Sequence, residues 1–379
     1  MKKVFFVGLT GLLLFEILNV YFIMPMPGSQ KMNSIDVAYF LYTWRWLFRI
    51  LFGLMIIIGL FKFNWKRKWL LLIPIVLLAI VVYEANFVMA ADHMFYQPKK
   101  LLMVNAGANK VDSQRLVIGV VLNGDAKAYP IRYLGFHHQV QDTVGGKPLI
   151  ITYCTVCRTG RVFEPIVKGK YEKFRLVGMD HFNAMFEDAT TKSWWRQVTG
   201  EAIAGKLKGE KLPEILSKQT SLAEWLQLYP NSLVMQTDSS YLDSYDTTLN
   251  YENGKSRKKL TGTDSFSWKD KSWVIGIKTG NDTKAYDWNQ LKKARLIQDK
   301  IGNTPILLVL ANDNKSFFAF QRPTANSLFT LSNDTLISDT HYYRIDGYGI
   351  GSAFSLKPLP ASQEFWHSWR TFNPNTMKY

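Results

Sequence analysis

The first 90 residues contain three apolar runs, and each is long enough to cross a membrane as a helix. The runs extend over residues 4–24, 40–61 and 69–90. A helix needs about 20 predominantly apolar residues to span the hydrocarbon core of a bilayer. We therefore predict three transmembrane helices within residues 1–95, surrounded by membrane lipid. A cleavable signal peptide is the alternative for the first run, but the Met-Pro-Met-Pro-Gly sequence that follows is a turn without a small-residue cleavage site.

Basic residues predict how these helices are oriented. Lys2 and Lys3 precede the first run, and four lysine and arginine residues lie between residues 62 and 68, whereas the loop over residues 25–36 carries only Lys31. Loops rich in lysine and arginine remain in the cytoplasm. An odd number of spans then places residues 96–379 on the opposite, extracytoplasmic side.

Two arginines lie inside the second apolar run. Arg45 and Arg49 are one helical turn apart, and a charged side chain within hydrocarbon is costly unless it extends to the membrane surface or faces protein. We expect both to extend outward rather than to mark a functional pathway.

The remaining residues, 96–379, are sufficient for a large hydrophobic core, as one large or two ordinary domains. The formal net charge of the chain is +16. Its basic residues are spread along the sequence without an arginine-rich block or a known nucleic-acid motif, so we expect no nucleic-acid partner. Attraction to anionic lipid headgroups is the simpler explanation of the charge.

An internal repeat organises this domain. Val117-Ile118-Gly119 recurs as Val274-Ile275-Gly276, an offset of 157 (274 − 117), and residues 117–163 share 13 identities with residues 274–320 without a gap. This similarity indicates a duplicated unit, with pseudo-repeats over about 115–165 and 272–322.

Each copy has the pattern of a β unit. Residues 116–122 are apolar and β-branched, Asn123-Gly124-Asp125 is a hairpin turn, and residues 126–131 return. A short helix or loop and a further strand follow, over 149–153 in the first copy and 306–310 in the second. Between the copies we predict a helix over 221–228, with Ser221 as N-cap and Glu224 completing a capping box, and a polar surface loop over 241–264.

The two copies differ where chemistry is expected. Cys154 and Cys157 correspond to Ala311 and Asn314, and both histidines of the first copy, His137 and His138, are also replaced. Their joint loss predicts a single site in the first copy and a structural role for the second.

Cys154 and Cys157 are the two cysteines of the chain and form one Cys-x-x-Cys motif. On the oxidising side of a membrane such a pair is a disulfide, a redox couple or part of a metal site. Arg158-Thr159-Gly160 follows, which predicts a turn and a returning strand rather than the helix N-terminus of thiol oxidoreductases. Arg158 and Arg161 would favour thiolates electrostatically. A structural disulfide between the two cysteines is a remaining alternative, although a disulfide that closes so short a loop constrains the unfolded chain little.

Several segments together resemble a known bacterial family. They are Val117–Val120 to Lys127–Pro130, His138 to Gly146, Thr152–Cys157, Trp195–Gly205 and the C-terminal Glu364–Phe372. In this order they are similar to the bacterial domain of unknown function 3179, over roughly residues 113–379. The resemblance implies a fold and a candidate site rather than an activity. Because the family is bacterial, the three predicted helices place the chain in a bacterial inner membrane as a multi-pass protein. It also implies that His138, Cys154, Cys157 and Met185 occupy shared positions, whereas Thr155-Val156 replaces the more typical Pro-Leu.

A metal would need more ligands than the two cysteines. The candidates are His138 or His137, His181, and the thioether of Met179 or Met185, and a soft set of this kind favours copper as Cu(I) over zinc. Tyr153, Arg158, Trp195, Gln197 and Glu201 are further candidates for the surrounding pocket, with Glu201 as an acid or base. For Trp195 a place in the core is the favoured interpretation, whereas His181 can equally be a turn residue. We expect His93, His341 and His367 to be structural.

We therefore predict three N-terminal transmembrane helices followed by a mainly β (α+β) extracytoplasmic domain of duplicated origin. The leading functional hypothesis is copper binding or copper-dependent redox at Cys154, Cys157, His138 and Met185. A thiol-disulfide oxidoreductase is the alternative, with the cysteines as nucleophile and resolving thiol and His138 as base. A non-catalytic scaffold with a structural disulfide is the third, so enzymatic activity is left open. The partner is an unidentified protein or small molecule.

Overall fold

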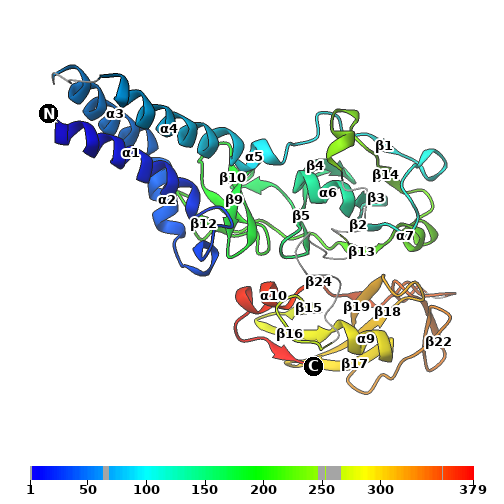
Figure 1. Ribbon diagram of the computed structural model, residues 1–379. Coiled ribbons are helices and arrows are strands. Elements are labelled where there is room, and N and C mark those ends of the chain that lie inside the picture. The colour runs from blue at the N-terminus through cyan, green and yellow to red at the C-terminus, as the bar shows by residue number, and fades with distance from the viewer. Residues whose placement is uncertain (1, 63–67, 246–251, 253–265, 352) are drawn as a thin grey trace. The chain divides into compact units, whose positions relative to one another are not determined.

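The computed structural model describes residues 2–62, 68–245, 252, 266–351 and 353–379. The chain forms two compact units, which are described separately (Figure 1). The first unit contains residues 1–96, 172–196 and 201–211, and the second contains 97–171, 197–200 and 212–379. Most of the basic loop used to predict orientation, and most of the loop predicted over 241–264, lies outside the described residues.

The first unit begins with a group of apolar helices. Helix α1 (Lys2–Tyr21) packs against α3 (Arg45–Phe61) and α4 (Leu72–Tyr83), as Figure 1 shows. Within the described residues, two helices are long and apolar enough to cross a membrane, over Lys2–Tyr21 and Trp69–Val88. The second of these contains α4 and the π-helix η3 (Glu84–Val88). The remaining helical elements of this segment are η1 (Ser29–Lys31), α2 (Ile35–Thr43), η2 (Lys68–Leu71) and α5 (Ala91–Met94).

The second apolar run is not one continuous helix. Helices α2 and α3 meet at Trp44 with a bend of 61°, so this pair is either a broken span or a re-entrant segment. No proline or glycine stands next to Trp44, so the sequence gave no clear indication of the bend. The chain thus has an N-terminal helical region with two candidate spans and this bent pair.

The expectation that both arginines extend outward is wrong for Arg49. Its guanidinium donates to both carboxylate oxygens of Glu16, at 2.7 and 3.0 Å, and to the amide oxygen of Asn86 at 2.5 Å. The Glu16 side chain is 1% exposed, and Asn86 donates to it at 2.9 Å. Arg45 instead donates to the carbonyl oxygen of Tyr42 and lies over its ring. Arg49 therefore faces protein, because partners from two other helices compensate its charge.

A small sheet completes the first unit. Its strands are β9 (Phe174–Asp180), β10 (Asn183–Asp188), β11 (Trp194–Arg196) and β12 (Ala202–Ala204), in the order β12-β11-β10-β9. Met185 and Trp194 pack in one core with Ala38 and Tyr39 of α2. These strands therefore belong to the same compact unit as the N-terminal helices, whereas the sequence predicted a single domain boundary between residues 95 and 96.

The second unit is mainly β, and one order of elements occurs in it twice. In the first stretch it is β2, β3, α6, β4, β5 and β6; in the second it is β15, β16, α9, β17, β18 and β19 (Figure 1). Both stretches confirm the predicted hairpin, the short helix and the strand over 149–153 or 306–310, but each contains one further strand before it, β4 or β17, that was not predicted. The bounds are β2 Leu116–Leu122, β3 Asp125–Pro130, α6 Ile131–His137, β4 Gln139–Val144, β5 Lys147–Cys154 and β6 Thr159–Phe163, then β15 Trp273–Thr279, β16 Asp282–Asp287, α9 Trp288–Ala294, β17 Leu296–Ile301, β18 Thr304–Leu310 and β19 Phe317–Gln321.

The correspondence extends beyond the stretch that is similar in sequence. Strand β2 pairs with β13 (Lys218–Ser221) and β15 with β24 (Ala361–Phe365), both antiparallel. Strand β3 pairs with β14 (Leu233–Met235) and β16 with β25 (Met377–Lys378), both parallel. A helix follows each outer strand, α7 (Leu222–Leu228) and α10 (Trp366–Phe372). As predicted, Ser221 caps α7 by accepting a hydrogen bond from the backbone of Glu224. Glu224 does not complete the predicted capping box, because the Ser221 backbone N–H donates to Ser316 Oγ at 2.9 Å instead.

Three residues that are identical in the two stretches make corresponding contacts. In the first, Lys127 and Tyr129 both bond to the carboxylate of Asp142, at 2.9 and 2.7 Å. In the second, Lys284 and Tyr286 bond to Asp299, at 2.6 and 2.9 Å. Each hairpin is thereby attached to the strand after its helix, which explains why lysine, tyrosine and aspartate recur at the 157 offset.

The remaining strands of this unit are short and lie outside the repeated order. They are β1 (Met103–Val104), β7 (Ile166–Val167), β8 (Lys170–Tyr171), β20 (Thr330–Ser332), β21 (Thr335–Ser338), β22 (His341–Arg344) and β23 (Lys357–Pro358), with 3₁₀ helices η4 (Ala106–Ala108) and η5 (Ser239–Ser244). Strand β1 extends the β2 sheet through β14, and β23 pairs with β19.

Candidate functional site

Cys154 and Cys157 lie on the turn that joins two antiparallel strands. Cys154 is the last residue of β5 and pairs with Thr159, the first residue of β6. Arg158 closes the turn with a φ of 59°. This confirms the predicted turn and returning strand. The thiols therefore do not lie at the start of a helix, where the helix dipole would lower a thiol pKa.

Both cysteines are buried, and both are thiols in the structure rather than a disulfide. Their side chains are hydrogen-bonded to each other, and burial raises the pKa of the Cys157 thiol well above its ordinary value. Burial disfavours the charged form, because a thiolate loses its hydration. At neutral pH the Cys157 thiol is therefore protonated until something compensates the negative charge.

The C-terminal corner of the chain covers this turn. The backbone N–H of Phe365 donates to the carbonyl oxygen of Cys157 at 3.0 Å. Ser368, on α10, is hydrogen-bonded to the Cys157 side chain and donates to Glu364 Oε2 at 2.7 Å. Lys271 Nζ donates to the carbonyl oxygen of Val156 at 3.0 Å and lies 4.2 Å from the centroid of the Phe365 ring. The thiols thus have a buried hydroxyl and an ammonium group beside them.

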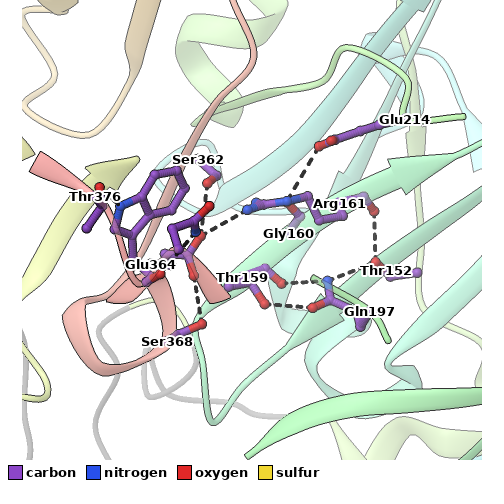
Figure 2. A network of polar contacts seen from close by, with 12 residues as sticks. Thr152, Thr159, Gly160, Arg161, Gln197, Glu214, Ser362, Glu364, Ser368 and Thr376 are labelled. Atoms are coloured by element: carbon purple, nitrogen blue, oxygen red, sulfur yellow. Dashed lines mark hydrogen bonds and ion pairs between the residues drawn. The ribbon is translucent and has the colours of Figure 1, made fainter. Parts of the chain in front are cut away.

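A polar network fixes the strand that carries the turn (Figure 2). Gln197 donates to Thr152 Oγ1 at 2.9 Å and accepts from Thr159 Oγ1 at 2.7 Å, so it bridges β5 and β6. Figure 2 also shows Arg161 of β6 directed toward Glu364, with an Nη2–Oε1 distance of 2.9 Å. Glu364 is fully buried, and its charge is compensated by this arginine. The network joins the cysteine turn to the C-terminal corner.

Both histidines of the predicted site are buried. His138 has a φ of 61°, and its Nδ1 lies 3.3 Å from the carbonyl oxygen of Phe136. Burial lowers the pKa of His138 to about 4, so its imidazole is neutral at neutral pH. His137 Nε2 is hydrogen-bonded to the hydroxyl of Tyr245 at 2.8 Å. A neutral imidazole can be a metal ligand or a base, so the protonation state of His138 fits either predicted role.

Tyr153 precedes the cysteine turn and Arg158 closes it, and both bond to residues outside the turn. The Tyr153 backbone donates to the carbonyl oxygen of His138 at 2.9 Å, and burial raises the pKa of its phenol. The Arg158 guanidinium donates to the carbonyl oxygen of Glu252 and to Gln363 Oε1, and it lies 3.8 Å from the centroid of the Trp273 ring.

Four predicted site residues belong to the first unit. Met185 is fully buried in β10, and Trp195 donates to Asp188 Oδ2 at 3.0 Å. His181 lies in the β9–β10 turn with Nδ1 2.7 Å from Asp180 Oδ1. Glu201 forms an isolated bridge with Lys211. Their predicted place around the cysteines therefore stays a prediction, as does the ligand role of Met185.

The side chains of the described residues show whether a cluster of metal ligands is already formed. In this part of the chain, no group of three or more histidine, cysteine, aspartate or glutamate residues is placed to hold a metal ion. The predicted set of Cys154, Cys157, His138 and Met185 stays a prediction. The contact between the two thiols is compatible with disulfide formation and with a soft ion held by two sulfur atoms.

Several residues at this site were missed in the sequence. Lys271, Glu364 and Ser368 had no assigned role, and His367 was expected to be structural, yet its imidazole is hydrogen-bonded to the carbonyl oxygen of Val156. Burial lowers the pKa of His367 to about 4. A signal was present, because Glu364–Phe372 is part of the family resemblance. It could not be connected to the cysteines, since more than 200 residues separate them (364 − 157).

Comparison with known proteins identifies the family. A family model described as Protein of unknown function (DUF3179) matches residues 99–376. The chain belongs to this family. The DUF3179 match includes both copies of the repeated element order, the cysteine turn and most of the C-terminal corner, and it excludes the helices before residue 99. No curated protein and no solved structure matches the chain.

Proposed function

We propose that this DUF3179 protein is a membrane-anchored copper protein in which Cys154 and Cys157 bind one Cu(I) ion. The observation that carries the proposal is the mutual hydrogen bond of two buried thiols on a single β-turn. Thiolates are soft ligands and select Cu(I) over harder ions. His138 is the proposed third ligand and Met185 a softer fourth. In this proposal Tyr153, Gln197, Trp195, Glu201, His137 and His181 belong to the surroundings of the ion.

The charges around the turn support a monovalent ion. Two thiolates with one Cu(I) carry one net negative charge, and the Lys271 ammonium on the Val156 carbonyl can compensate it. A buried site is most stable when its charges are compensated and hydrogen-bonded. Arg161 does not contribute, because it is paired with Glu364.

Binding in this site releases protons. Because burial raises the pKa of the Cys157 thiol, the ion has to displace thiol protons, and affinity falls as pH falls. Ser368 has one hydroxyl proton, which it donates to Glu364 in the structure. When the metal binds, the Ser368 hydroxyl can rotate and donate its hydrogen bond to the Cys157 sulfur instead.

The second candidate function is a thiol-disulfide couple, and the same contact between the sulfur atoms favours it. The two thiols would lose two electrons and two protons to a disulfide-bearing extracytoplasmic partner, with His138 as base. The burial and the raised thiol pKa argue against it, because the thiolate is the attacking species. A structural disulfide without catalysis is the third candidate.

We further propose that the helical region crosses the membrane three times, with the bent pair α2–α3 as the second span, and that the family domain is extracytoplasmic. The helices α1 and α4 and the bent pair support this topology. We also propose that residues 115–165 and 272–322 arose by duplication, supported by the shared element order and contacts.

Copper binding is tested on the full chain in detergent. Residues 96–379 alone would be unsuitable, because strands β9–β12 pack with the N-terminal helices in one unit. Anaerobic titration with Cu(I) against a chromophoric chelator should give one ion per chain, and Cys154→Ser with Cys157→Ser should abolish it. Asn314→Ser, at the position equivalent to Cys157, is the matched control and should retain binding. Copper retained by the double variant would refute the site.

Redox chemistry is separated from metal binding by titrating the metal-free protein with dithiol–disulfide buffers. A reversible couple near extracytoplasmic potentials, without copper retention, would support the oxidoreductase. Sidedness is tested with Asn231→Cys and Lys62→Cys, since both side chains are exposed. A membrane-impermeant maleimide added to intact cells stripped of their outer membrane should label only the first, and the reverse result would contradict the topology.

A further inference from the structure

A cavity of about 250 Å³ lies in the second unit, beside the cysteine turn. Its floor is buried and includes Arg158, Gln363 and Leu116, whereas Lys292 and Asn314 are exposed at its rim. The cavity is therefore open to solvent above a buried polar floor. Neither the family assignment nor the proposed copper site gives it a role.

Residues equivalent in the repeated element order meet in this cavity. Arg158 and Lys315 are related by the 157 offset (315 − 158), and both line it. Leu116 and Trp273 are related by the same offset (273 − 116), and they also line it. Equivalent turns of the two stretches thus contribute a cation each to one space.

The charge of the cavity is positive. Among the described residues, three cations line it, Arg158, Lys292 and Lys315, with one carboxylate, that of Glu252. That carboxylate is already paired with Arg115 at 3.0 Å. Lys315 Nζ donates to two neutral oxygens of Gln114, at 2.9 and 3.0 Å. A negatively charged ligand would therefore meet uncompensated cations.

The buried positive charge of Arg158 is the main evidence for the role of this cavity. The Arg158 guanidinium is fully buried, and it donates two hydrogen bonds to the Glu252 carbonyl oxygen and one to Gln363 Oε1, all of them uncharged acceptors. Among the described residues, no carboxylate forms an ion pair with it, and the Trp273 ring at 3.8 Å compensates the charge only in part. The nearby Glu252 carboxylate also acts on this charge, but it is ion-paired with Arg115. A buried cation that is only partly compensated is unfavourable, so a bound anion would stabilise it.

A second unsatisfied donor lies on the same floor. Gln363 is 1% exposed, and its Oε1 accepts from Arg158 and from Gln219, which fixes the orientation of the amide. In the described part of the chain, no acceptor lies within hydrogen-bonding distance of its Nε2. A buried donor left in this state costs about 1–3 kcal/mol. An acceptor entering the cavity would satisfy it.

We infer that this cavity binds a small organic anion, whose carboxylate or phosphate oxygens bond to Arg158 and Gln363 and whose flat apolar part lies against Trp273 and Trp288. A guanidinium matches both oxyanions through its planar fork. The two indole rings lie 6.1 Å apart between centroids at an angle of 52°, and both line the cavity.

The probes are benzoate and phenyl phosphate, with benzamide as the neutral analogue of benzoate and sodium chloride at equal ionic strength. They are added to the full chain in detergent, and saturable binding is followed by tryptophan fluorescence and thermal unfolding. We expect saturation with at least one anion and none with benzamide or chloride. Benzoate alone would assign a carboxylate ligand, and phenyl phosphate alone a phosphate ester.

Two adjacent lysines provide the matched variants. Lys292→Glu should weaken binding about fivefold, because it reverses a charge at the rim, whereas Lys293→Glu on the same helix does not line the cavity and should have no effect. Arg158→Gln should weaken anion binding at least about tenfold. If this variant does not fold, the comparison of Lys292→Glu with Lys293→Glu tests the inference. No saturable anion binding, or equal loss in both lysine variants, would overturn the inference.

Discussion

The ammonium group of Lys271 donates a hydrogen bond of 3.0 Å to the carbonyl oxygen of Val156, one of the two residues between the cysteines. Lys271 is half-buried, and burial lowers its pKa while the two thiols oppose this effect. The lysine is thus held beside the position where negative charge would develop if the thiols ionised. This contact connects two segments more than 100 residues apart (271 − 156).

We predict that Lys271→Gln lowers Cu(I) affinity about tenfold, because one compensating charge is lost from a buried site. The loss should grow as pH falls, since the thiols then ionise less readily. Chelator competition between about pH 6 and about pH 8.5 measures it. Lys269→Gln, an exposed neighbour, is the control, and equal affinity in both variants would exclude Lys271 from the site.

His138 predicts how stability depends on pH. Its pKa is about 4 in the folded chain, below the ordinary 6.5, so folding favours the neutral form. The stabilisation is complete above pH 6.5 and is lost as pH falls toward 4. In His138→Asn, the free energy of unfolding should fall by about 2–3 kcal/mol less than in wild type when the pH is lowered. Asparagine is chosen because it tolerates the positive φ at this position.

Thermal unfolding of the full chain at pH 7 and about pH 4.5 measures this difference. His93→Asn, which changes an exposed imidazole, should leave the acid sensitivity unchanged. An equal decrease in Tm for wild type and His138→Asn would show that the histidine does not titrate as described. His367, with a pKa of about 4, contributes in the same direction, so some acid sensitivity should persist.

The raised pKa of Glu224 makes its contribution to stability depend on pH in the opposite direction. Burial, together with Asp313, Asp334 and Asp346, raises its pKa to about 7. Its stabilising, protonated form is present below pH 4.5 and is lost as pH rises through 7. Glu224→Gln should stabilise the chain by about 1 kcal/mol at pH 8 and have no effect near pH 4. Glu210→Gln, at an exposed position, is the control in the same unfolding measurement, and a stabilisation independent of pH would contradict the assignment.

Local patterns predicted the repeated unit well. The hairpin before α6 was visible because the Asn123-Gly124 turn and the apolar periodicity around it are local signals. The 157 offset then predicted the second hairpin and its strand. The cysteine turn was likewise predicted from Arg158 and Gly160, since the residues that form a tight turn are adjacent in sequence.

Contacts between distant segments could not be predicted in this way. Glu16 was hidden in an apolar run, so the ion pair of Arg49 was missed and its outward extension was expected instead. Lys271 and Ser368 reach the cysteines through strand pairing of β24 with β15, which no local signal encodes. The union of β9–β12 with the N-terminal helices has the same cause, because packing rather than periodicity determines it.

Two glycines test whether the two stretches pack alike. A Cβ at Gly119 would lie 2.1 Å from the Trp225 ring, and a Cβ at Gly276 would lie 2.1 Å from the Trp369 ring. We predict that Gly119→Ala and Gly276→Ala each destabilise the chain by about 3 kcal/mol, because these buried indoles cannot move away. Gly107→Ala, whose Cβ would meet ordinary contacts, should be nearly neutral. If thermal unfolding shows that only one of the two variants, Gly119→Ala or Gly276→Ala, is destabilised, the two stretches do not pack alike.

The ion pair between Glu16 and Arg49 predicts strong coupling inside the helical region. Either Glu16→Gln or Arg49→Gln leaves a buried charge without compensation and should cost about 3–5 kcal/mol. The double variant should be closer to wild type than either single variant, because two amides can hydrogen-bond to each other and to Asn86 without burying a charge. Thermal unfolding of the four proteins in one detergent gives the coupling energy, with Glu84→Gln as a control at an exposed position of the same region. Additive losses in the double variant would show that the two residues do not act as a pair, and Arg49 would then have to be compensated by Asn86 and the helix backbone alone.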